Sequence, residues 1–438
     1  MQDGDHQHGP RENFVPLLLI VAAVVAAALF TRTFNTVAVL ASIVAMVMIH
    51  EFGHFLTAKW SGMKVTEYFL GFGPRLWSFK RGETEYGVKA IPAGGYVRIS
   101  GMSSAEKVDA VDEPRTYRQQ PYWQKVVVAS AGSFMHFVMA FLILVILFGF
   151  LGVKPAAVID EYPSEVTTSP ARQGGLVAGD KIKSIDGIKT DDWVDVQRVV
   201  RERPNKTVEV VVERRGNQIP LSIALADRTA MPASERAVAS QNGADLTTLG
   251  YLGARRANVY STESLGESAV LSVKTMGTAL QLAVNSLVDR FSPSGIESLA
   301  RQVRDARSNG EARAAAQESN QPAPQTETSQ DDARLVSPLG LVTFSHQAAE
   351  AGIRPVLQFL FSVNLFVGVF NLIPLLPFDG GHIAIATYEK LRSLRGRRHF
   401  VNHEKLMPLS YAVLFVLISL SLSALWLDAW YPVQDVFG

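Results

Sequence analysis

The sequence has 438 residues, of which 47% are hydrophobic and 19% charged, and its mean hydropathy of +0.13 is high for a purely soluble protein. The length suggests about three domain-sized pieces of roughly 150 residues each. A net charge of +1 gives no reason to expect nucleic acid as a partner, and the lack of cysteine excludes disulfides and thiolate metal sites.

Five apolar runs follow one another along the chain. The first, Phe14–Phe30, has 17 residues, near the lower limit for a helix that spans a bilayer. Because the residues before it are not basic, we interpret it as a retained helix rather than a cleaved signal peptide. The sequence therefore predicts a multi-pass α-helical membrane protein with about five transmembrane helices. The later runs cover about Val37–Ala58, Val126–Val153, Val356–Leu376 and Met407–Leu427.

Lys and Arg residues orient these spans. The segment Lys59–Lys125 carries eleven of them and Tyr388–Leu406 carries six, so we expect both segments in the cytoplasm. Five spans then place the N-terminus inside the cell and the long segment Lys154–Pro355 outside it.

The second apolar run ends in His-Glu-Phe-Gly-His at residues 50–54. On a helix, His50 and His54 are one turn apart, so both imidazoles leave the same face and can share one metal ion. Glu51 lies beside them, placed to take a proton from a metal-bound water. Ionisable groups at membrane depth are costly and are seldom kept without a function.

The outer segment begins with a β-rich module, Lys154–Ala257. Asp186-Gly187 signals a tight turn, Asp192–Arg201 has helical spacing, and Thr207–Val212 alternates like a strand. Together with the glycine-rich stretch Gly174–Ile182, this string resembles a PDZ domain, which adds a peptide strand to the edge of its sheet. The alternative is a small β-domain that packs on its neighbours.

Two further segments complete the outer part. Leu265–Phe291 is amphipathic, and we expect it on the membrane surface or over the membrane-embedded core of the protein. Arg304–Arg334 is rich in Ala, Gln, Ser, Glu and Asp and nearly lacks large apolar residues. Because it cannot bury enough surface to fold, we predict a disordered linker.

A zinc ion needs at least three protein ligands and an open position for water, so two histidines are insufficient. Asp379 is the best candidate for the third. It follows the fourth apolar run, in a stretch where Pro374 and Pro377 break the helix and Gly380-Gly381 allows close approach of backbone. Such backbone is tolerated at membrane depth only within protein or beside a water-filled cavity. Alternatively, Asp379 caps a helix at a turn on the membrane edge.

The two motifs together, His-Glu-x-x-His and then Asn-x-x-Pro-x-x-Pro-x-Asp-Gly, resemble the site-2 class of intramembrane zinc proteases, in its bacterial branch with a PDZ insert. The resemblance extends from Ala41 to Leu427 apart from the linker. It implies that His50, His54 and Asp379 hold zinc and that Glu51 is the catalytic base. It further implies a bacterial plasma-membrane enzyme that cuts the transmembrane segment of single-span proteins, such as anti-sigma factors or signal-peptide remnants, after an earlier cut.

The chemistry of the site agrees with this resemblance. Zinc lowers the pKa of its water to roughly 7 and polarises the scissile carbonyl, and Glu51 can pass the proton to the departing nitrogen. We hypothesise that Asn371 binds the substrate backbone or the oxyanion; the alternative is that it satisfies backbone freed by Pro374. Asn364, on the same helix face, is better explained as an interhelix hydrogen bond.

The cytoplasmic segment carries a further feature of the family. Gly71–Pro74, the alternating Thr84–Ala90 and the following Ile91–Ile99 look like its membrane-re-entrant β-hairpin. A strand edge there could capture an unwound substrate, which makes Gly94, Gly95 and Tyr96 candidate substrate contacts. Alternatively, the hairpin only plugs the cytoplasmic face.

The sequence departs from the family pattern at three places. Ser133 and His136 stand where relatives usually have Pro and Asn, Phe378 replaces the usual Leu, and the first span is extra. We interpret His136 as a helix-packing residue rather than a fourth polar group at the metal. A metal transporter would need more such ligands in the other spans, and an inactive PDZ-presenting scaffold would have no reason to keep these four site residues.

The predicted organisation has six parts. They are an N-terminal tail with the extra helix (1–33), the first part of the catalytic core (34–153), an extracytoplasmic α+β PDZ-like domain (154–257), an amphipathic helical segment (258–303), the linker (304–334) and the second part of the core (335–438).

Overall fold

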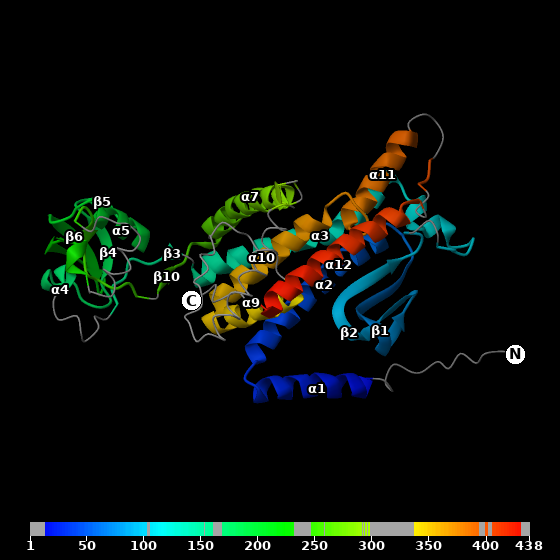
Figure 1. The fold of residues 1–438 in the computed structure, drawn as a ribbon, viewed down its shortest axis with the longest axis horizontal. Helices are drawn as coiled ribbons and strands as arrows, with labels where there is room; N and C mark the ends of the chain where they lie inside the picture. Colours follow the sequence, from blue (N-terminus) through cyan, green and yellow to red (C-terminus); the bar gives the residue numbers. More distant parts are fainter. Residues whose placement is uncertain are drawn as a thin grey trace, which may run out of the picture. The chain divides into compact units, whose positions relative to one another are not determined.

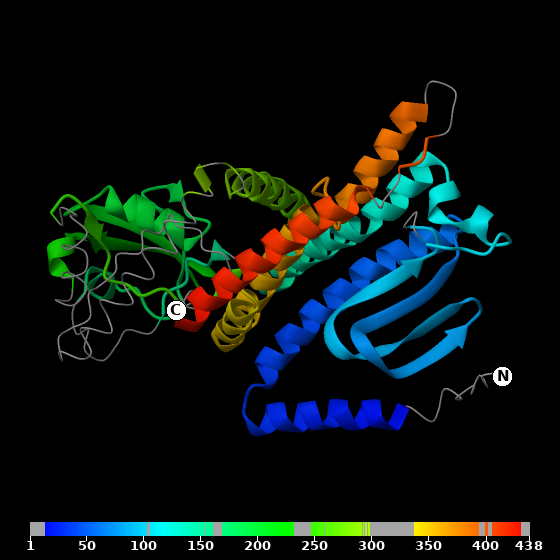
Figure 2. The same cartoon turned by 45° about the vertical axis from the view of Figure 1, so that its right-hand side comes forward.

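Two compact units make up the chain in the computed structural model (Figures 1 and 2). One comprises Met1–Leu144 with Ser272–Gly438, and the other is Val145–Leu271. The structure describes residues 14–102, 106–152, 154–160, 169–231, 247–257, 259–290, 292, 294–295, 297, 337–393, 399–401 and 405–430. The predicted linker 304–334 lies outside these residues.

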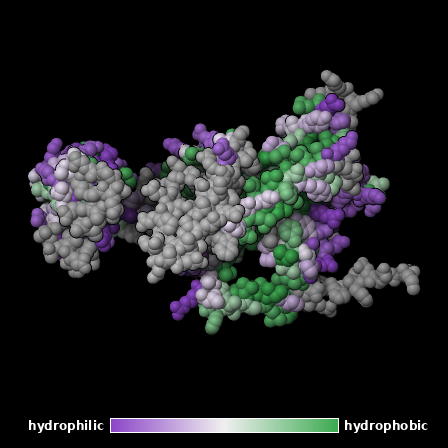
Figure 3. Space-filling view, in the orientation of Figure 1, coloured by the Kyte–Doolittle hydropathy of each residue, from purple (hydrophilic) through white to green (hydrophobic). Residues whose placement is uncertain are grey.

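Among the described residues, four helices are long and apolar enough to cross a membrane: α2 (Phe34–Trp60), α3 (Tyr122–Ile146), α10 (Ile353–Asn371) and α12 (Met407–Trp430). A π turn at Leu147–Leu151 extends α3. Figure 3 shows apolar residues along α12, where even Phe415 is 72% exposed. Such exposure is costly in water but not in lipid, so these helices support a multi-pass membrane protein.

The first apolar run forms α1 (Phe14–Phe30), which is shorter than the four candidate spans. It is apolar all round and is joined to α2 by a short turn. At its start, the rings of Phe14 and Trp77 of the hairpin meet edge to face at 5.6 Å. A fifth transmembrane helix therefore stays a prediction.

The remaining helices of the described chain are α9 (Pro338–Ala351), α11 (Asp379–Ser393) and α7 (Leu265–Arg290). Helix α9 packs between α2 and α10, where Val39, Met46, Ala349 and Leu360 form a buried cluster. The helix expected at 265–291 is confirmed as α7, and its place on the membrane surface or over the core stays a prediction.

A long β-hairpin follows α2, as the resemblance to the family implied. It consists of β1 (Val65–Arg81) and β2 (Thr84–Ile99). Both strands bend back on themselves, so Phe69 pairs with Tyr96 on one side and with Gly87 on the other. The result is a ribbon of four strand segments side by side, in the order 95–99, 65–70, 84–88 and 75–81, in which residues 95–99 form an outer strand. The bend uses Gly71 at φ +84°, where a Cβ atom would lie 2.6 Å from the Ile91 carbonyl oxygen.

The second unit is built around a four-stranded sheet in the order β5-β4-β6-β7, covered by α5. Its buried cluster includes Ile182, Ile185, Val196 and Val210. The turn at Asp186-Gly187, the helix after Asp192 and the strand from Thr207 are all found where the sequence predicted them. The elements are β3 (Lys154–Pro155), α4 (Pro170–Gln173), β4 (Lys181–Ile185), β5 (Ile188–Lys189), α5 (Trp193–Arg201), β6 (Thr207–Arg214), β7 (Asn217–Ala224), β8 (Ala226–Asp227), β9 (Gly250–Tyr251) and β10 (Tyr260–Ser261).

Candidate metal centre

The two histidines of the His-Glu-Phe-Gly-His motif lie on one face of α2. Both are buried, with exposed fractions of 6% for His50 and 4% for His54. Their Nε2 atoms are 3.2 Å apart, and the rings meet nearly at right angles. Because the residues are one helical turn apart, a single helix brings both nitrogens to one point.

Asp379 reaches the same point from the other end of the sequence. Helix α10 ends at Asn371, the chain bends through residues 372–378, and Asp379 begins α11. Its Oδ2 lies 3.5 Å from His50 Nε2 and 3.3 Å from His54 Nε2. A Cβ atom at Gly380 would lie 2.2 Å from the Leu372 carbonyl oxygen, so the predicted close backbone approach requires glycine here.

The three ligand atoms fit a zinc ion. Their separations of 3.2, 3.3 and 3.5 Å form an almost equilateral triangle. Zinc bonds of about 2.0–2.1 Å in a tetrahedron separate neighbouring ligand atoms by about 3.3–3.4 Å. The buried Oδ2 of Asp379 makes no hydrogen bond within the described residues, as expected of an atom reserved for a cation. Among the residues that the structure describes, this is the one group of three His, Asp or Glu side chains whose ligand atoms all lie within 4.8 Å of one another.

Helix α3 packs against the two histidines and orients them. The Nδ1–H of His54 donates to the Val128 carbonyl oxygen at 2.7 Å, which leaves Nε2 with its lone pair toward the ligand point. Gly132 lies against both rings, and a Cβ atom there would lie 2.3 Å from His54 Nε2 and 2.4 Å from His50 Cε1. Sequence reasoning assigned Gly132 no role. Its only signal in the sequence is that a glycine, which weakens a helix, stands inside an apolar helix.

Glu51 is held by the hairpin. Its Oε2 accepts a hydrogen bond from the backbone N–H of Val97 at 3.1 Å. Val97 belongs to the outer strand 95–99, whose other side pairs with β1. This contact was not predicted, because a backbone N–H carries no sequence signal.

The outer strand approaches α2 closely beside Glu51. A Cβ atom at Gly95 would lie 2.5 Å from Met48 Sδ and 3.6 Å from Glu51 Cγ. The hydroxyl of Tyr68 donates to the Met48 carbonyl oxygen at 2.8 Å and fastens the same turn of helix to β1. The structure therefore brings Gly95 to Glu51.

The other predicted substrate contacts lie in different surroundings. Gly94, at φ +136°, faces the ring of Phe72. The hydroxyl of Tyr96 donates to Glu67 and accepts a hydrogen bond from Lys89 at 2.7 Å, and its ring stacks with neighbouring aromatic rings. Asn371 is half-buried at the end of α10, and in the described part of the chain its side chain makes no hydrogen bond.

His136 and Asn364 link helices α3, α10 and α2 close to the candidate metal centre. His136 Nδ1 donates to Asn364 Oδ1 at 2.9 Å, and the Asn364 amide nitrogen lies 2.9 Å from Met46 Sδ. The rings of His136 and His50 are 5.0 Å apart between centroids. The predicted helix-packing roles of both residues are confirmed, and the close ligand group does not include His136.

Comparison with known proteins identifies the family. Residues 38–417 match peptidase family M50. The chain belongs to peptidase family M50. It is 30% identical to the zinc metalloprotease Rip1 of Mycobacterium tuberculosis over 419 residues, which cover 90% of this chain and 96% of that protein. It is 29% identical to Rip1 of Mycolicibacterium smegmatis over 425 residues, with the same coverage of 90% and 96%.

Proposed function

We propose that this protein cleaves the transmembrane segments of pre-cut single-span membrane proteins within the bilayer. The observation that carries the proposal is the meeting of three ligand atoms, buried between apolar helices, with Glu51 on the same helix and an outer strand beside it. Membership of peptidase family M50 and the likeness to Rip1 make the chain a zinc metalloprotease of the membrane.

His50, His54 and Asp379 would hold the zinc ion, which when bound acidifies a water molecule and polarises the scissile carbonyl. Three protein ligands leave a fourth position open, as in catalytic rather than structural zinc sites. The carboxylate of Glu51 takes a proton from the attacking water. As the new C–O bond forms and the peptide C–N bond breaks, it delivers that proton to the departing nitrogen.

The outer strand 95–99 would present the substrate. A helical transmembrane segment hides its peptide groups in its own hydrogen bonds, so it must be unwound before attack. One edge of the outer strand pairs with β1. At its other edge, the backbone N–H of Val97 donates a hydrogen bond to Glu51. An unwound segment that adds to this edge would pass beside the carboxylate. Gly94, Gly95, Tyr96 and Asn371 are the proposed substrate contacts.

The second unit would act outside the membrane. Its sheet β5-β4-β6-β7 with the covering helix α5 is in keeping with a PDZ-like domain. Together with the predicted linker it would exclude substrates that still carry an intact outer domain, either by bulk or by holding a peptide. The basic segments of the core support a topology with the hairpin in the cytoplasm of a bacterial cell and the second unit outside it.

Replacement of Glu51 by Gln tests the proposal directly. The variant keeps the size of the side chain but cannot take a proton, so we expect cleavage of a truncated single-span substrate in proteoliposomes to fall by at least about 100-fold. Its zinc content and thermal unfolding should match those of the unchanged protein. Glu209→Gln, on β6 of the second unit, is the matched control and should cleave normally. Full cleavage by the Glu51 variant would refute the proposed role.

A further inference from the structure

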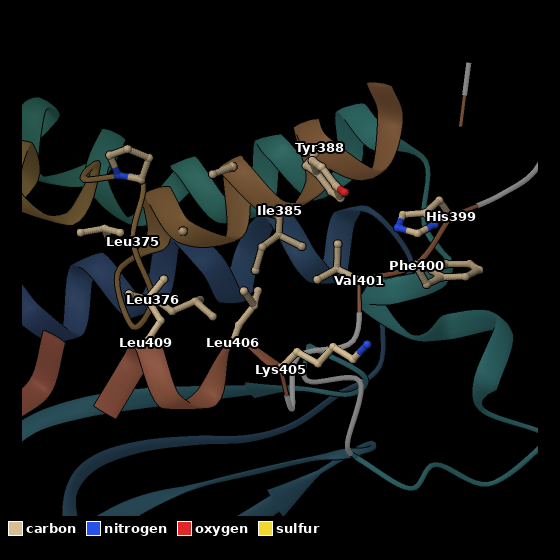
Figure 4. A pocket seen from close by; sticks show the side chains of 13 residues that line it. Leu375, Leu376, Ile385, Tyr388, His399, Phe400, Val401, Lys405, Leu406 and Leu409 are labelled. Atoms are coloured by element: carbon tan, nitrogen blue, oxygen red, sulfur yellow. The ribbon is translucent and has the colours of Figure 1, made fainter. Parts of the chain in front are cut away.

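A groove lies between α11 and the beginning of α12 (Figure 4). It has a volume of about 600 Å³, within the usual range of about 300–1,000 Å³ for sites that bind small molecules. Its walls come from the bend before α11, from α11 itself and from the segment that leads into α12. No step of the proposed proteolysis uses it.

One wall of the groove is held by hydrogen bonds and an ion pair. The backbone N–H of His399 donates to Ser393 Oγ at 3.0 Å, and that of Val401 donates to Glu389 Oε1 at 2.9 Å. The second oxygen of Glu389 pairs with Lys125 at 2.9 Å, and both side chains are nearly buried. These bonds fasten the wall at residues 399–401 to α11.

The two ends of the groove differ in chemistry. Figure 4 shows Leu376 and Leu409 at one end, and Lys405 and His399 at the other. In the described part of the chain, no carboxylate pairs with the Lys405 ammonium group. The groove is therefore apolar along its length and positively charged at one end.

We propose that this groove binds one acyl chain of an anionic phospholipid, with the phosphate at Lys405. Ile385, Leu406 and Leu409 offer hydrocarbon to the chain. The lining residues on α11 and α12 have backbone groups that are bonded within their helices, and the N–H groups of His399 and Val401 already donate to Ser393 and Glu389. An extended peptide would find few partners here for its own N–H and C=O groups, whereas an acyl chain has no such groups to satisfy. Basic pockets between transmembrane helices on the cytoplasmic side bind anionic headgroups, and the charge of residues 388–406 predicts that side.

The bound acyl chain would touch the bend that precedes Asp379, a proposed metal ligand. Leu375, Leu376 and Gly381 line the groove, and they stand on either side of Asp379 in sequence. The lipid would thus support the 372–378 bend that leads to Asp379. The binding itself does not depend on the proposed protease activity, so either can fail without the other.

Retention of lipid by the full chain tests this proposal. The protein is reconstituted in phosphatidylcholine discs with and without phosphatidylglycerol, released into mild detergent and examined by native mass spectrometry. We expect the unchanged protein to retain one phosphatidylglycerol. Lys405→Gln should reduce the preference for phosphatidylglycerol over phosphatidylcholine about fivefold, the effect of one basic residue at a membrane surface. Leu409→Trp should fill the groove and retain neither lipid.

Leu414→Trp is the matched control, because Leu414 is exposed on α12 and does not line the groove. It should retain phosphatidylglycerol as the unchanged protein does. Equal retention by all four chains would overturn the proposal, as would displacement of the lipid by inorganic phosphate alone. Cross-linking of a single-span substrate, in place of lipid, to a photoreactive residue at position 409 would overturn it in favour of a substrate groove.

Discussion

The two histidines proposed as metal ligands, His50 and His54, lie close to the proposed base, Glu51, on α2, but they are held by different parts of the molecule. His54 is oriented by a carbonyl of α3, and Gly132 of α3 packs against both histidine rings. The Glu51 carboxylate is instead held by one backbone N–H of the hairpin. Metal binding should therefore depend on helix packing, whereas turnover should depend in addition on the hairpin. Substitutions on the two sides should separate these properties.

Gly132→Ala should have the largest effect. The new methyl group would lie 2.3 Å from His54 Nε2, so at least one imidazole must leave its place. We expect zinc content to fall and cleavage to drop by about 100-fold or more. Zinc analysis and a cleavage assay in proteoliposomes measure both.

Gly277→Ala on α7 provides the control, since a Cβ atom there meets nothing within 4 Å. It should retain zinc and activity. If the Gly132 variant kept full zinc content, the tight packing of α3 against the ligands would not be what fixes them.

Gly95→Ala should act on the other side of the comparison. Its methyl group would lie 2.5 Å from Met48 Sδ and push the outer strand away from Glu51. We expect cleavage to fall by between about 10-fold and 100-fold, as for a displacement of about 1 Å at a reacting group, while zinc content stays normal.

The second change Met48→Ala removes the atom that the new methyl group meets. The double variant should recover part of the lost cleavage, and the coupling of the two changes measures the contact. Loss of zinc from the Gly95 variant would contradict the separation of the two regions.

Glu83→Gln should have the smallest effect. At the tip of the hairpin, Glu83 receives hydrogen bonds from Arg115 at 2.7 and 2.8 Å and from Lys59 of α2 at 2.7 Å. The Arg115 guanidinium, and then Lys59, lower the pKa of Glu83 from 4.5 to about 2. Because the pKa is lower in the folded state, this pairing stabilises the protein fully above pH 4.5, and the gain is lost as the pH falls toward 2.

Thermal unfolding of the Glu83 variant between neutral and acid pH checks this. Its loss of stability should be at most about 1 kcal/mol at neutral pH, since the pair is partly exposed, and should vanish at low pH. A difference that stayed constant with pH would show that packing, rather than charge, anchors the hairpin.

The ligand group could be predicted because each member carries a local signal. His50 and His54 have helical spacing, and Asp379 follows two prolines and precedes two glycines. The sequence also predicted the strands and turn of the second unit, where alternation and Asp186-Gly187 leave little choice.

The contacts between elements could not be predicted. Alternation in 84–90 predicts a strand. It does not predict that the hairpin bends into four paired strand segments whose outer one lies at Glu51. Nearly every residue has a backbone N–H, so nothing in the sequence marks the one of Val97 that binds Glu51. Likewise, Gly132 matters because it packs against the rings of His50 and His54, and these lie on α2, far from Gly132 in the sequence.

The late position of Asp379 has a consequence during synthesis. It follows His54 by 325 residues, and the whole second unit lies between them. At about 5–20 residues per second, a ribosome needs on the order of tens of seconds to make that stretch. Until then the nascent chain has only two of the three proposed ligands, so the proposed zinc site is incomplete while the chain is still being inserted beside other proteins.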